Sequence, residues 1–77
     1  MTDATWPKLP PPTAAEVRAA RDELALTLAQ AAEIAGLGAG PRWAEYESGA
    51  RHPSPAVWEL FLLRTGQHPT HRLVPLE

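Results

Sequence analysis

Cysteine is absent from the 77 residues of this sequence. Its absence excludes a disulfide framework, a thiolate nucleophile and a zinc site of the cysteine type, so a domain this small must rely on packing or dimerisation. No apolar run approaches the roughly 20 residues that cross a bilayer, and the N-terminus lacks the basic and apolar segments of a signal peptide. We therefore expect a cytoplasmic protein with no membrane partner.

β-branched aliphatic residues are scarce. Valine and isoleucine together supply four residues, whereas alanine supplies 14 and leucine 10. The apolar content therefore lies in residues that favour helices over strands. A chain of this length buries only about 60% of its unfolded surface and has room for one core. The composition predicts a single all-α domain.

Catalytic patterns are missing as well. The sequence has no serine, histidine and acid set and no glycine-rich phosphate loop, and a helical chain of 8.4 kDa offers no deep cleft. His68 and His71 have a spacing that could place two metal ligands on one helical face, but Pro69 between them disfavours a helix. We expect no enzymatic activity, no metal site and no cofactor.

Positive charge is limited. Seven lysines and arginines against nine acids give a net charge of -2, and Lys8 is the single lysine. Nucleic-acid-binding proteins usually show a basic excess, because they neutralise phosphates. This net negative charge does not exclude DNA binding, because DNA binding depends on where the few arginines lie on the surface.

The N-terminal region is rich in proline, with four of the nine prolines in residues 1–12. Each proline fixes its own φ and disfavours helix at the residue before it. We therefore predict an extended arm over residues 1–12. Trp6 in this arm either packs on the core of its own domain or inserts into a groove of a partner.

Capping residues divide the rest of the chain into four predicted helices. Thr13 begins a Thr-x-x-Glu capping box, which predicts a helix over 14–25 with an apolar face that contains Val17, Ala20 and Leu24. Thr27 precedes an alanine-rich run that predicts a short helix over 28–35, ended by Gly36.

The next two helices are marked in the same way. Gly40 and a proline at the start and Gly49 at the end predict a helix near 40–48. Ser54 followed by proline predicts a helix over 55–65 that ends at a glycine. Residues 67–77 contain two more prolines and are predicted to form an irregular or briefly extended tail.

The helix over 55–65 is apolar nearly all round, so it requires cover on two sides. We expect the core to contain the aromatic residues Trp43, Tyr46, Trp58 and Phe61. The side of this helix that does not face the core can be covered in two ways. The tail can fold back with its apolar residues, Leu73, Val74 and Leu76. A second copy can instead bind at a dimer face whose candidates are Ala56, Leu60 and Leu63.

Five short motifs follow one another between residues 17 and 66. They are Val17-Arg18-x-x-Arg21, Leu26-Thr27, Ala32-x-x-Ala35-Gly36-Leu37, Trp43-x-x-Tyr46-Glu47-Ser48-Gly49 and Pro53-Ser54-Pro55. This pattern resembles the Cro/CI-type (XRE) helix-turn-helix family over about two-thirds of the chain. Within that family the C-terminal half looks most like small phage-borne and mobile-element regulators, including anti-CRISPR-associated repressors.

The resemblance implies a lambda-repressor-like domain of four to five helices over residues 13–66, with the helix over 40–48 in the DNA major groove. It implies a salt bridge between Arg21 and Glu47 that ties the first helix to the reading helix. It also implies DNA phosphate contacts, for which the candidates are Thr27, Leu28, Ser48, Arg51 and His52.

The chain departs from the family pattern at Leu28, where the family often has a glutamine, and in a turn that is one residue longer, with Gly38 as the candidate insertion. The outward positions of the reading helix are predicted to start at Gly40, and the base-contact candidates are Pro41, Arg42, Ala44 and Glu45. The arginine can donate two hydrogen bonds to guanine and the glutamate can accept one from cytosine. The alternative is that these two form a solvated ion pair.

These patterns predict a sequence-specific DNA-binding transcriptional regulator, in its simplest form a homodimeric repressor. Its expected partner is double-stranded DNA with a pseudo-palindromic operator whose half-site centres lie about 10 base pairs, or a multiple of this, apart. The alternative is a protein-interaction module, or an antitoxin-like partner, on a helix-turn-helix scaffold that has lost base readout. The acidic balance and the small residues of the reading helix favour this alternative.

Overall fold

The computed structural model describes residues 9–76, and this part of the chain contains four helices. They are α1 (Ala14–Asp22), α2 (Leu28–Ile34), α3 (Gly40–Ser48) and α4 (Pro55–Thr65). No strand occurs within the described range, so the predicted all-α fold is confirmed. The predictions for Trp6 and for residues 1–8 of the N-terminal arm fall outside the described residues. No helix between residues 9 and 76 has the length and apolar character needed to cross a membrane.

Side-chain caps fix the starts of α1, α2 and α4, whereas α3 begins after Ala39 with no side-chain cap hydrogen bond. Thr13 Oγ1 accepts a hydrogen bond from the Glu16 amide at 3.1 Å, and the Thr13 amide donates to Glu16 Oε1 at 2.8 Å. Thr27 and Gln30 form the same reciprocal box at the start of α2. Ser54 Oγ accepts from the Val57 amide at 3.2 Å at the start of α4. The predicted starts of these three helices are therefore confirmed.

The end of α1 differs from the prediction by three residues. α1 ends at Asp22, because Ala25 adopts a left-handed φ of 51° and the Leu26 amide turns back to donate to the Arg21 carbonyl at 3.2 Å. The expected place of Leu24 on the apolar face is wrong, since this residue lies in the closing turn and is 48% exposed. An alanine occupies the position where glycine usually marks a helix end.

The start of α3 lies against the start of α2. A Cβ atom at Gly40 would lie 3.3 Å from the Ala29 amide nitrogen and 3.5 Å from the Leu28 carbonyl carbon. Gly40 was expected on the outward face of α3, and this expectation is wrong because the residue faces the backbone of α2. The absence of a side chain there permits the close approach of the two helices.

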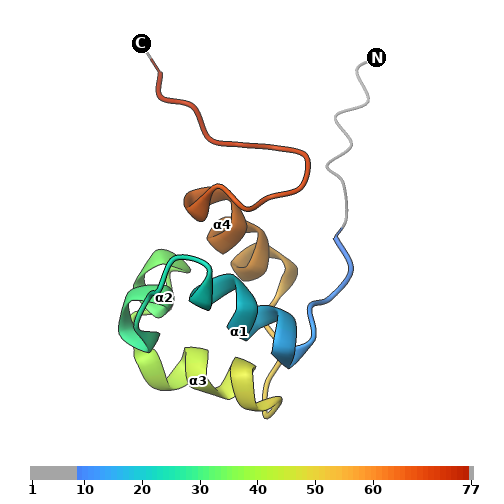
Figure 1. The fold of residues 1–77 in the computed structure, drawn as a ribbon, viewed down its shortest axis with the longest axis vertical. Helices are drawn as coiled ribbons and strands as arrows, with labels where there is room; N and C mark the ends of the chain where they lie inside the picture. The colour runs from blue at the N-terminus through green and yellow to red at the C-terminus, as the bar shows by residue number, and fades with distance from the viewer. Residues whose placement is uncertain (1–8, 77) are drawn as a thin grey trace.

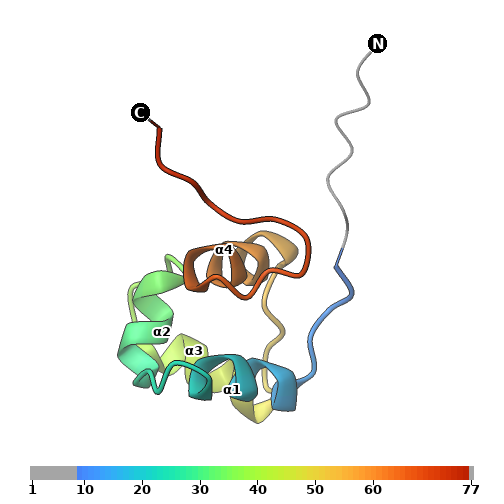
Figure 2. The same ribbon diagram turned by 45° about the horizontal axis from the view of Figure 1, so that its top comes forward.

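The core is built on α3 and α4, and the expected aromatic residues lie in it. Trp43 and Phe61 are fully buried, with ring centroids 4.5 Å apart, and Tyr46 and Trp58 are 5% and 8% exposed. Three alanines are buried in the same core, namely Ala31 and Ala32 of α2 and Ala35 at its C-cap. Figures 1 and 2 show α4 on one side of the core, α3 on the other and α2 at one end.

The tail does not provide the second cover of α4. Leu73, Val74 and Leu76 are 59%, 65% and 99% exposed, which contradicts the alternative in which they fold back on that helix. Cover comes instead from Leu9, which packs against the core, and from His68, whose side chain is fully buried with Nε2 4.0 Å from Glu59 Oε1. As predicted, residues 67–76 contain no helix or strand.

Candidate functional site

The inner side of α3 carries a glutamate that is bound by two other segments. Glu47 Oε1 accepts from Arg21 Nη2 at 3.0 Å, and Glu47 Oε2 accepts from Arg21 Nε at 2.5 Å. The Trp43 indole nitrogen donates to the same Oε2 atom at 2.7 Å. The ion pair that the family resemblance implied is thus present in the structure, with both side chains mostly buried.

Arg21 also holds the chain that leads into α2. Its Nη1 atom donates to the Leu26 carbonyl at 2.8 Å, so one guanidinium joins α1, α3 and the turn before α2. The hydrogen bonds from this guanidinium hold the pKa of Glu47 below its ordinary value, against the opposing effect of burial. The same contact raises the pKa of Arg21. Both groups therefore stay charged at neutral pH and fix the position of α3.

Sequence reasoning missed two members of this network. The spacing of Trp43 and Glu47 is i, i+4 on one helix, which brings two side chains together, so a sequence signal for that contact existed. The Leu26 carbonyl had no such signal, because its position depends on where α1 ends. Buried indole and guanidinium groups need acceptors, and here one carboxylate and one backbone carbonyl supply them.

The outer side of α3 carries an exposed cluster of three charged residues, Arg42, Glu45 and Arg51, which we call the outer cluster. Glu45 Oε1 lies 2.9 Å from Arg51 Nε and 3.6 Å from Arg42 Nε. The three side chains are between 44% and 58% exposed. The alternative of an Arg42–Glu45 pair at i, i+3 is therefore present, and Arg51 joins it from the loop after α3.

The outer cluster borders an open hollow of about 510 Å³ between α3, residues 49–54 and the start of α4. Arg42, Arg51 and His52 all line this hollow, together with Tyr46 and Ser54. The structure thus brings one base-contact candidate and two phosphate-contact candidates to one surface. Their grouping follows from the path of the loop, which sequence spacing does not reveal.

The other contact candidates lie on α3 and at the start of α2. Pro41 and Ser48 are exposed at the two ends of α3, whereas Ala44 is half-buried. Ser48 Oγ donates to the Glu45 carbonyl at 3.0 Å and accepts from the Ala50 amide at 3.3 Å, which closes the end of the helix.

Thr27 and Leu28 lie exposed at the start of α2, next to the start of α3. The Thr27 amide and hydroxyl are both used in the capping box with Gln30, at 2.9 and 3.1 Å. Gly38, the candidate insertion in the turn, adopts a left-handed φ of 81°.

The dimer-face candidates do not form one open surface. Ala56 is exposed, but Leu60 and Leu63 are half-buried. Leu60 Cδ2 would lie 3.7 Å from a Cβ atom at Gly36, so the end of α2 covers part of this side chain. Arg64 Nη1 donates to the Ile34 carbonyl at 3.0 Å and strengthens the same contact. α4 therefore presents less free apolar surface than its sequence indicates.

The two C-terminal histidines lie in one turn. His68 Nδ1 accepts hydrogen bonds from the amides of Thr70 at 3.2 Å and His71 at 3.1 Å. These bonds require Nδ1 to be unprotonated, so it acts as an acceptor for the backbone. Within residues 9–76, no group of three potential metal-binding side chains is placed to hold an ion.

Comparisons of this chain with models of protein families, with curated proteins and with solved structures found no match.

Proposed function

We propose that this protein is a sequence-specific DNA-binding regulator, with α3 as the element that enters the major groove. The observation that carries the proposal is the division of α3 into two sides. Trp43, Tyr46 and Glu47 fix the helix from within, and Pro41 and Arg42 on its outer side are exposed to solvent. A rigid helix with an uncovered outer face is the element that helix-turn-helix proteins insert into DNA.

Base recognition is assigned to Arg42 and Glu45. The guanidinium of Arg42 suits the O6 and N7 atoms of guanine, and the carboxylate of Glu45 suits the amino group of cytosine. In the free protein these groups contact each other at 3.6 Å. Exposed ion pairs contribute only about 0–1 kcal/mol, so exchanging this contact for base contacts has a small energetic cost.

Phosphate contact is assigned chiefly to Arg51. Its guanidinium is 58% exposed and lies on the loop that borders α3, with His52 beside it. Breaking its 2.9 Å contact with Glu45 would release one positive charge toward the DNA backbone. Ser48 and the start of α2 are the further candidates on this side. Such contacts position a protein on DNA without reading the sequence.

The proposed active form is a homodimer. Two copies related by a two-fold axis would place their α3 helices about 34 Å apart, in successive major grooves on one face of the duplex. The operator would then be a pseudo-palindrome, and binding over a promoter would repress transcription by steric exclusion.

An anisotropy titration against the DNA that flanks the protein's own gene, at two salt concentrations, tests this proposal. A DNA-reading protein must bind tightly, and its affinity must fall steeply as salt rises. Arg42→Ala is expected to relax specificity at one base pair, whereas Arg51→Ala is expected to weaken all sequences alike and to flatten the salt dependence. Arg18→Gln removes one exposed charge on α1 that is assigned no DNA contact, and it serves as the control. Identical behaviour of the Arg42 and Arg51 variants would contradict the assigned roles.

A protein-interaction module is the second candidate function. The observation that favours it is the outer cluster itself, because one carboxylate contacts both arginines and leaves the α3 surface with little net charge. If this candidate is correct, the purified protein binds none of the DNA duplexes tested at low salt. Tight and salt-dependent binding to the flanking DNA would exclude it.

A further inference from the structure

The C-terminal tail exposes an apolar segment that the proposed DNA contacts do not use. Leu73, Val74 and Leu76 lie within four residues of one another and are each more than half exposed. Elsewhere in residues 9–76, the exposed large hydrophobic side chains are the separated Leu24 and Leu28. A concentrated apolar segment on a soluble surface usually marks an interaction site.

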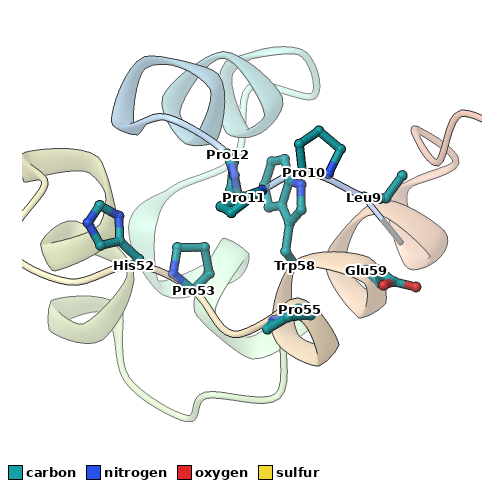
Figure 3. Close-up of a pocket in the computed structure, with 9 residues that line it drawn as sticks. All are labelled: Leu9, Pro10, Pro11, Pro12, His52, Pro53, Pro55, Trp58 and Glu59. Carbon is teal, nitrogen blue, oxygen red and sulfur yellow. The ribbon is translucent and has the colours of Figure 1, made fainter. Parts of the chain in front are cut away.

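A groove of complementary character lies at the start of α4 (Figure 3). It has a volume of about 290 Å³ and lies between residues 9–12 and the start of α4. Five prolines and Trp58 form most of its wall, with His52 toward one end and Glu59 toward the other. A second hollow of about 170 Å³ shares Leu9 and Trp58 with the first and continues to Glu16 and Pro69. We call the two hollows together the proline groove.

The chemistry of the proline groove selects an apolar, extended occupant. Proline has no amide hydrogen, so the wall offers few backbone donors and binds chiefly through apolar contact. The occupant must also tolerate acidic groups, because Glu16 and Glu59 line the two hollows. The tail meets both requirements, since Arg72 directly precedes its apolar segment and forms no ion pair within the described residues.

The tail borders the groove of its own chain at Pro69, but its apolar segment, residues 72–76, does not line either hollow. The tail starts at the C-terminal end of α4, runs back along α4 toward the N-terminal arm, turns there and ends away from the arm in both Figures 1 and 2. The occupant that fits is therefore the tail of a second copy. Reciprocal exchange around a two-fold axis would fill both grooves and shield both tails.

We propose that two copies of this chain dimerise by placing residues 72–76 of each in the proline groove of the other. This inference rests on the dimer that the proposed function requires, and it assigns that dimer a surface other than the expected face of Ala56, Leu60 and Leu63. The apolar side chains bind along the prolines and Trp58, and Arg72 lies near the acidic groups of the groove.

Sedimentation equilibrium of the full chain tests whether the tail and the proline groove form the dimer surface. Leu73→Glu with Leu76→Glu is expected to raise the dimer dissociation constant at least about tenfold, because charges would enter an apolar groove. Pro10→Glu alters the exposed edge of the groove and is expected to have the same effect. Leu24→Glu, at an exposed leucine elsewhere, is the matched control and should leave the constant unchanged. A dimer that resists the tail substitutions but dissociates with Ala56→Glu would overturn the inference, as would a wild-type chain that is monomeric at every concentration.

Cross-linking provides a second test that does not depend on affinity, because the natural chain has no cysteine. Chains with Leu76→Cys and chains with Pro10→Cys, mixed in equal amounts and oxidised, are expected to form a disulfide-linked heterodimer. Leu24→Cys in place of Leu76→Cys is the control. Equal yields of disulfide-linked heterodimer from the Leu76→Cys and Leu24→Cys chains would contradict the tail exchange.

The two proposals can fail separately. If the chain forms the tail cross-link but binds no DNA duplex, the proposal of DNA binding is contradicted and the tail exchange stands. Salt-dependent operator binding by a protein that forms no tail cross-link would contradict the tail exchange alone.

Discussion

The two sides of α3 carry the same pair of residue types in different surroundings. Glu47 and Glu45 are two positions apart on one helix, so they point to different sides of it. Glu47 is 13% exposed and binds Arg21, Trp43 and, through the arginine, the carbonyl of Leu26. Glu45 is 44% exposed and lies between two arginines that are at least as open to solvent.

Burial decides what each pair contributes. When a mostly buried pair is broken, the remaining charge cannot recover its hydration, so loss of one partner is strongly destabilising. When an exposed pair is broken, water and salt replace the lost contact at little cost. The inner pair is therefore a fixed part of the fold, and the outer cluster is free to exchange partners when a ligand arrives.

The largest effect is expected for Glu47→Gln. This change leaves the mostly buried guanidinium of Arg21 with only the exposed carboxylate of Asp22, 3.8 Å away, as a counter-charge, and we expect a loss of about 3 kcal/mol in the free energy of unfolding. Urea unfolding of the variant and the wild type measures the difference. A loss below about 1 kcal/mol would show that the inner pair is no stronger than an exposed one.

Acid should remove the contribution of the inner pair gradually. The pKa of Glu47 is lowered in the folded state from its ordinary value of 4.5, so its stabilisation is present above pH 4.5 and is lost as the pH falls through the folded value. The stability gap between wild type and Glu47→Gln is expected to narrow below pH 4.5, by at most about 1.4 kcal/mol per pH unit. Urea unfolding at several acidic pH values measures this gap. A gap that stays constant with pH would contradict the role of the carboxylate charge.

Ala25→Gly tests the backbone beside the inner pair without changing any charge. Ala25 has a left-handed φ of 51°, which glycine adopts without strain, so we expect a gain of about 1 kcal/mol in stability. Ala50→Gly, in an exposed loop without positive φ, is the control and should be slightly destabilising. Thermal unfolding of both variants measures the contrast. A loss of stability in Ala25→Gly would contradict the left-handed conformation of Ala25 in the turn after α1.

The smallest change in stability is expected for Glu45→Gln, below about 0.5 kcal/mol. The same variant removes a negative charge from the outer face and frees both arginines of the outer cluster. We therefore expect its affinity for DNA of unrelated sequence to rise, measured by anisotropy at low salt. A destabilisation comparable to that of Glu47→Gln would show that the two sides of α3 do not differ as described.

Local signals in the sequence located most of the helix boundaries. Each capping box joins residues three positions apart, and Gly49 and Gly66 adopt the left-handed φ that helix ends require. The end of α1 was misplaced because alanine takes that role at position 25. The Arg21–Glu47 contact was available only through the family resemblance, since 26 positions separate the two residues.

Composition and capping by themselves determined an all-helical chain and the starts of α1, α2 and α4, because those choices depend on neighbours within a single helical turn. Which glutamate of α3 is buried, that Arg51 reaches Glu45, and that the apolar tail remains outside the core were decided by tertiary structure alone. These outcomes depend on how segments far apart in the chain compete for the same surface, and only the packed arrangement of the helices sets that competition.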